Sequence, residues 1–125
     1  MLKAMLLAGL GGFCGTCLRY LTGKFCGALV VTAFPLGTFV VNILGSLLIG
    51  VLFGLGERTN MISPAVSALL ITGFCGGFTT FSSFANETYV LISQKHWIMM
   101  LLYTVLSVVL GVVMVVLGRM WVKNF

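Results

Sequence analysis

Charged side chains are scarce in this chain of 125 residues. Only 7% of the residues are Asp, Glu, Lys or Arg, whereas a soluble domain carries about 25%. The acidic side chains and the one histidine are Glu57, Glu87 and His96. Glu57 and His96 fall in expected loops, and Glu57 is expected to form a solvated pair with its neighbour Arg58. Because hydrolytic and redox chemistry needs an acid, a base or a cofactor ligand, we predict that the protein is not an enzyme and has no organic cofactor.

Two further classes of site lack the residues that they need. The seven Lys and Arg give a net charge of +5, but they form no basic stripe, which argues against a nucleic-acid partner. Cys14 and Cys17 form a C-x-x-C pair inside an apolar run, without a second pair or a nearby His, so neither a zinc site nor a thioredoxin-like site has its context. With Cys26 and Cys75, they are expected to be small packing residues.

Uncharged apolar sequence is what the chain has in excess. Hydrophobic residues make up 60% of it, and the mean hydropathy is +1.19. A helix that spans the bilayer needs about 20 mainly apolar residues. The uncharged runs predict an all-α integral membrane protein with one domain over residues 1–125, built from helices at about 2–21, 34–56, 64–93 and 97–122. The Gly-rich segment 22–33 leaves the adjoining helix ends open.

The N-terminus has a second interpretation. A basic start followed by an apolar run also fits a signal peptide. Arg19 and Tyr20, together with the lack of a polar mature domain, favour a retained helix.

The basic residues are almost evenly divided between the two membrane faces. When the four spans are threaded in order, one face receives Lys3, Arg58, Arg119 and Lys123, and the other receives Arg19, Lys24 and Lys95. An excess of Lys and Arg in cytoplasmic loops normally sets orientation. Four basic residues on one face and three on the other give almost no bias in orientation. We therefore predict insertion in both directions, which permits an antiparallel homodimer.

The third apolar segment is interrupted at its centre by GFCGGFTT, residues 73–80. Adjacent glycines followed by two threonines weaken a helix. Irregular backbone at membrane depth persists only where it is buried in protein or lines a polar cavity, and such breaks often place free carbonyl groups at an ion site. We therefore predict a third helix that is broken in mid-membrane.

Two polar residues within the spans are candidates for function. Asn42 must find a partner or face water; it either makes an interhelical hydrogen bond or offers its two N–H donors to an anion. Glu87 either has a function inside the membrane or reaches an aqueous vestibule.

Three aromatic rings follow at a spacing of three residues: Phe78, Phe81 and Phe84. Such a stripe usually packs in a core, but the positive edge of an aromatic ring can also line a path for a small anion. The neighbouring hydroxyl groups of Thr79, Thr80, Ser82 and Ser83 would then be donors.

Three motifs in order resemble the Fluc (CrcB) fluoride channels: GGFCGTCLRY at 11–20, FPLGTFVVNILGS at 34–46 and GFCGGFTTFSSF at 73–84. The resemblance covers nearly the whole chain. It implies a dual-topology homodimer of antiparallel subunits, multi-pass in the inner (plasma) membrane of the cell. Such a dimer passes fluoride through two pores, exports it passively and lowers its toxicity.

The resemblance also implies roles for individual residues. Phe81 and Phe84 would be the pore phenylalanines, and Asn42 the pore amide. The polar lining would comprise Ser82, Ser83, Thr38, Tyr103, Ser107 and Glu87, with Arg19 in a vestibule. Backbone carbonyls of Gly76 and Thr79 from both subunits would hold a structural sodium ion at the dimer interface. Phe78 stands where the family often has Leu, and the extra polar Asn86 makes the lining near Glu87 less certain.

Two other functions compete with the channel. A small multidrug-type proton-coupled antiporter needs a carboxylate within the membrane, and Glu87 is the one acidic residue in a predicted span. A purely structural membrane subunit would produce no ion flux.

Overall fold

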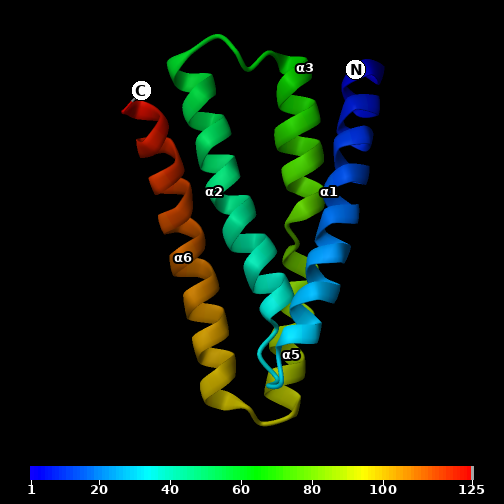
Figure 1. Ribbon diagram of the computed structural model, residues 1–125, viewed down its shortest axis with the longest axis vertical. Coiled ribbons are helices and arrows are strands. Elements are labelled where there is room, and N and C mark those ends of the chain that lie inside the picture. Colours follow the sequence, from blue (N-terminus) through cyan, green and yellow to red (C-terminus); the bar gives the residue numbers. More distant parts are fainter. Residues whose placement is uncertain (125) are drawn as a thin grey trace.

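The computed structural model describes residues 1–124, and over that range it contains helices and no strands (Figure 1). The long helices are α1 (Leu2–Leu29), α2 (Leu36–Arg58) and α6 (Trp97–Lys123). The third apolar segment, Pro64–Ser93, is divided into shorter pieces. All four segments are long and apolar enough to cross a membrane, which confirms the expected four-span, all-helical class.

The third span consists of α3 (Pro64–Val66), the π-helical stretch η1 (Ser67–Cys75), α4 (Gly76–Phe78) and α5 (Phe81–Ser93). It starts where the Ser63 hydroxyl accepts a hydrogen bond from the amide of Val66 at 3.2 Å, a usual N-cap. Between α4 and α5 the backbone is extended, with ψ of 159° at Thr79 and 126° at Thr80. The third helix is therefore broken within the predicted segment 73–80, at its two threonines.

The first helix is longer than the sequence indicated. It was expected to end near Leu21 but continues to Leu29. Gly23 and Gly27 each destabilise a helix by about 1 kcal/mol, which is too little to end it. A proline would end the helix. The first proline of the chain is Pro35, directly before α2.

The helices pack as two pairs, α2 along α6 and α1 along η1 and α4 (Figure 1). Gly11 and Gly15 are buried where α1 meets the third span. A Cβ atom would lie 2.8 Å from the Phe74 amide nitrogen at Gly11, and 2.8 Å from that of Phe78 at Gly15. Small residues let the two backbones approach this closely, and this contact fixes α1 beside the break.

Most of the outer surface is apolar, as lipid contact requires. Large hydrophobic side chains are exposed along α1 and α6, and both tryptophans, Trp97 and Trp121, lie near the ends of α6 with more than half of their surface exposed. Cys26 and Cys75 are buried, but Cys14 and Cys17 are exposed on α1. The packing role expected for Cys14 and Cys17 is therefore wrong within this chain, because they lie on the face that turns away from η1.

Candidate functional site at the helix break

The side chain of Asn42, on α2, is hydrogen-bonded to the backbone at the break. Its Nδ2 donates to the Thr80 carbonyl at 3.0 Å, and its Oδ1 accepts from the Thr80 amide at 2.8 Å. The side chain thus satisfies both backbone polar groups of one extended residue, which lipid could not do. Of the two interpretations of Asn42, the interhelical hydrogen bond is present. One N–H of the amide group is not used by this pair of bonds.

The same rearrangement releases two carbonyl groups. In a continuous helix the Thr80 amide would donate to Gly76 and the Ser83 amide to Thr79. The Thr80 amide bonds Asn42 instead, and the Ser83 amide donates to the Thr80 hydroxyl at 3.2 Å. The carbonyl groups of Gly76 and Thr79 therefore lose their helical donors at membrane depth.

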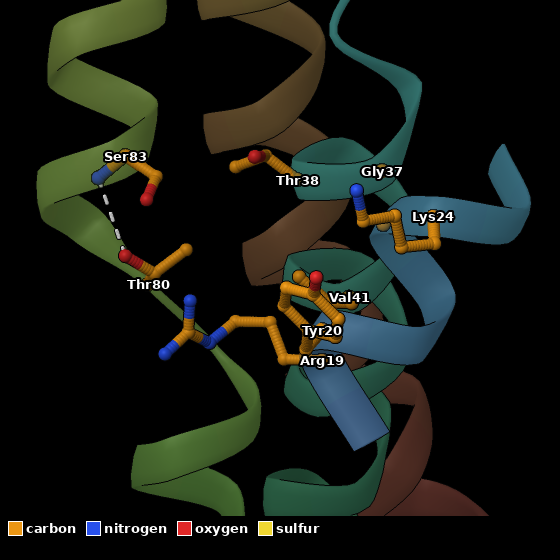
Figure 2. Close-up of a pocket in the computed structure, with 9 residues that line it drawn as sticks. Arg19, Tyr20, Lys24, Gly37, Thr38, Val41, Thr80 and Ser83 are labelled. Atoms are coloured by element: carbon orange, nitrogen blue, oxygen red, sulfur yellow. Dashed lines mark hydrogen bonds between the residues drawn. The ribbon is translucent and has the colours of Figure 1, made fainter. Parts of the chain in front are cut away.

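A third carbonyl at the break is bonded by Arg19. Its Nε donates to the Gly77 carbonyl at 2.9 Å, and its guanidinium group points from α1 toward the extended segment (Figure 2). Arg19 is part-buried in this contact. Arg19 therefore has two features at the break: a hydrogen bond to its backbone and a positive charge beside it.

On one side of the break lies a cavity of about 300 Å³. It brings together five site residues predicted from the sequence: Asn42, Thr79, Phe81, Phe84 and Ser107. The Oγ atom of Ser107 is buried and has no hydrogen-bond partner among the described residues. The polar part of the lining thus includes an unused hydroxyl donor and an amide with a spare N–H, beside the hydroxyl groups of Ser46, Thr79 and Thr80, and no formally charged side chain lines the cavity.

The phenylalanines do not form one stripe. Phe78 precedes the break, is buried and stacks on Phe74 with ring centroids 6.0 Å apart. Phe81 and Phe84 follow the break, with centroids 5.9 Å apart and planes tilted by 50°. The extended threonines interrupt the helix, so a spacing of three residues does not place Phe78 on the same face as Phe81. Phe78 lies in the core, whereas Phe81 is 78% exposed.

A second cleft, of about 330 Å³, lies nearer the α1–α2 connection (Figure 2). Its lining includes Arg19, Lys24, Thr38 and Ser83. Thr80 lines this cleft and the first cavity, so both spaces adjoin the broken backbone. The lining carries two cations and no carboxylate, which favours the approach of an anion.

Glu87 lies on α5 against α2 and α6. Its Oε1 accepts from the Tyr103 hydroxyl at 3.4 Å, and the Thr38 side chain is a second hydrogen-bond partner. The Tyr103 side chain is fully buried and packs on Phe84, with ring centroids 5.1 Å apart. The structure thus places these three predicted polar residues in one group, and Tyr103 joins that group to Phe84.

Sequence reasoning missed Ser46 and gave Thr80 too small a role. Thr80 was counted only as a neighbouring hydroxyl, although it caps α5, bonds Asn42 and lines both spaces; a threonine three residues before Ser83 and just after a helix-weakening run was the available signal. Ser46 also lines the cavity, with its hydroxyl donating to the Asn42 carbonyl at 2.7 Å. Ser82, predicted as lining, is exposed and lines neither space in this chain.

The expected pair of Glu57 with Arg58 is wrong. Glu57 forms its ion pair with Arg119 of α6, and Arg58 donates to the Val122 carbonyl. Adjacent residues point about 100° apart around a helix and do not face each other. Both bonds therefore join α2 to α6 instead of closing on α2 alone.

Comparison with known proteins gives a consistent family. The model of the family described as CrcB-like protein, Camphor Resistance (CrcB), matches residues 6–119. A protein of Leptospira interrogans named fluoride-specific ion channel FluC is 42% identical over 123 residues, which cover 98% of this chain and 97% of the relative. A protein with the same name from Flavobacterium psychrophilum is 47% identical over 110 residues, which cover 88% of this chain and 89% of the relative. Another from Azobacteroides pseudotrichonymphae is 39% identical over 125 residues, which cover both chains fully. With four spans, the break and this degree of identity in agreement, the chain belongs to the CrcB family.

Proposed function

We propose that this chain is a subunit of a fluoride-selective ion channel of the cell membrane that lets cytoplasmic fluoride leave passively and so lowers its toxicity. The observation that carries the proposal is the cavity at the break, where Asn42, Ser107 and two phenylalanines meet without a charged side chain. Relatives with 39–47% identity are named fluoride-specific ion channels. An ion channel performs no covalent chemistry, which agrees with the near absence of acids and bases.

The lining suits a small, strongly hydrated anion. Fixed dipoles must replace the water of an ion at membrane depth, and conduction requires that no single site holds the ion too tightly. The spare N–H of Asn42, the unpartnered Ser107 hydroxyl and the positive edges of Phe81 and Phe84 are several weak donors in sequence. Arg19 and Lys24 in the adjoining cleft would raise the local concentration of the anion without standing in this cavity.

An antiparallel dimer would complete the site. Phe81 is 78% exposed and Gly76 is exposed, although both adjoin the break, so a second copy is the natural cover for this face. The near-even division of basic residues between the two ends supports insertion of copies in opposite directions. Two cavities related by the dimer axis would then give two pores.

A sodium ion at the centre of this dimer fits the donors that the break provides. Within residues 1–124 no group of three His, Cys, Asp or Glu side chains can hold a metal, so a cation would rely on backbone oxygen atoms. The Gly76 and Thr79 carbonyl groups have lost their helical donors, and two copies would supply four such hard oxygen ligands. The ion would hold the two breaks together and add positive charge near the pores.

The test is efflux of fluoride from liposomes that contain the purified protein, measured with a fluoride electrode beside a chloride control. We expect rapid fluoride release with little chloride release. Phe81→Ile should slow the release while the dimer persists; Phe13→Ile is the matched control, because Phe13 is similarly exposed, at 68%, but lies on α1 away from the cavity. No fluoride release from folded dimer would refute the proposal and direct attention to proton-coupled exchange through Glu87, an antiporter role that no contact in the structure favours.

A further inference from the structure

A large cleft lies far from the break, at the end of the molecule that holds both termini. Its volume is about 580 Å³, and it lies between the last turns of α2 and α6. Its lining is Gly54, Glu57, Arg58, Val116, Arg119, Met120 and Lys123. None of these residues lines the cavities at the break, so the channel function does not account for the cleft.

The cleft is electropositive. Among the described residues that line it, three are cations and one is a carboxylate, Glu57, which is paired with Arg119. Arg119 also lies over the Phe53 ring, 5.2 Å from its centroid. The Arg58 guanidinium donates to the Val122 carbonyl, which holds it at the end of α6. The cations are thus positioned by contacts between the two helices.

The walls of the cleft change from polar to apolar along its length. Val116 and Met120 are four residues apart on α6 and are 48% and 53% exposed, and they continue from the cations toward the middle of the span. Gly54 leaves room at the base, where a Cβ atom would be 3.2 Å from the Arg119 Cα atom. The exposed Trp121 beside the cleft marks the depth of the membrane–water interface.

We propose that this cleft binds an anionic phospholipid, with the lipid phosphate at Arg119 and Lys123 and an acyl chain along Val116 and Met120. The positive charge selects an anion, and planar guanidinium groups suit the oxygen atoms of a phosphate. The apolar wall selects a lipid over a free phosphate, because a free ion gains nothing from Val116 and Met120. This site is independent of the channel function.

The test is native mass spectrometry of the purified protein in neutral detergent, titrated with phosphatidylglycerol. The variant is Lys123→Gln, because Lys123 contributes charge without either of the interhelical bonds made by Arg58 and Arg119. One juxtamembrane cation changes binding by about five-fold, so we expect the dissociation constant to rise about five-fold. Lys3→Gln, which removes the same charge from the same end of the molecule, is the control and should change it less than about two-fold.

A second variant separates binding from damage to the fold. Glu57→Gln removes the one carboxylate among the described residues of the cleft, so it should tighten phosphatidylglycerol binding by about two- to five-fold, a change that loss of structure would not produce. Equal binding to the Lys123→Gln variant and the unmodified protein would overturn the proposal. Equally tight binding of zwitterionic phosphatidylcholine, or displacement of the lipid by millimolar inorganic phosphate, would overturn it too.

Discussion

Replacing Asn42 by alanine tests whether a single side chain maintains the broken helix. The change removes both hydrogen bonds to Thr80 and leaves one amide and one carbonyl group without a partner at membrane depth. An orphaned polar group costs about 1–3 kcal/mol, which gives about 2–6 kcal/mol for two. Measured interhelical hydrogen bonds in a membrane average about 0.6 kcal/mol, which sets a lower bound of about 1 kcal/mol. We expect a loss of stability between these limits.

The measurement is unfolding of the purified protein by a denaturing detergent, followed by circular dichroism. Ser46→Ala is the matched control, because Ser46 also lies on α2 and lines the same cavity, but its hydroxyl bonds only the carbonyl one turn before it. Ser46→Ala should change the free energy of unfolding by less than about 1 kcal/mol. If Asn42→Ala and Ser46→Ala are equally stable, Asn42 does not support the break, and any loss of fluoride flux in Asn42→Ala would reflect contact with the ion alone.

Three further predictions concern packing and conduction. In the same unfolding assay, Gly50→Ala should destabilise the protein by about 1–3 kcal/mol, because its Cβ would enter the backbone of α6. Gly9→Ala is the control: its Cβ meets open space, so this change should be neutral or stabilising by up to about 1 kcal/mol. The reverse order of stability would contradict the packing of α2 on α6. Phe81 is 78% exposed in one chain and would be covered only by the second copy, so Phe81→Leu should lower the free energy of unfolding by about 1 kcal/mol or less. It should nevertheless reduce fluoride efflux at least about ten-fold, a loss of roughly 1.4 kcal/mol in barrier terms; a large loss of stability together with the loss of flux would argue for a packing role. Arg19→Gln should slow fluoride entry and flatten its dependence on ionic strength, and an efflux rate that stays unchanged at low salt would exclude Arg19 from the anion path.

Composition was sufficient for the helical class, because membrane spans are dictated by hydrophobic length, and the run of glycines and threonines was sufficient to locate the break in the third helix within residues 73–80. They were insufficient for the end of α1, since the Gly-rich run after Leu21 has no proline to end the helix. The break lies within the predicted segment 73–80, but the sequence does not show which residues of that segment leave the helix: Gly77 packs closely on α1, where a Cβ would lie 2.6 Å from the Gly12 carbonyl oxygen, and the extended residues are Thr79 and Thr80. Local propensity cannot show which of two weak points a neighbouring helix will support.

The candidate site was predictable as a set of residues and unpredictable as a set of bonds. Asn42 was recognised as a polar residue that needs a partner, but the partner, the backbone of Thr80, is 38 residues away. The same holds for Arg19, whose acceptor is the Gly77 carbonyl. A backbone group becomes a partner only after a helix has broken, so no pattern of side chains along the chain reveals it.

Both termini lie at one end of the molecule (Figure 1), which constrains how two copies can be covalently joined. A short tether from the last helix of one copy to α1 of the next would leave both copies with the same orientation, and an antiparallel pair could not form within that fusion. One additional spanning helix in the tether would invert the second copy. Genetic fusions with and without such a helix would therefore read out subunit orientation by whether they conduct, without any label on the protein.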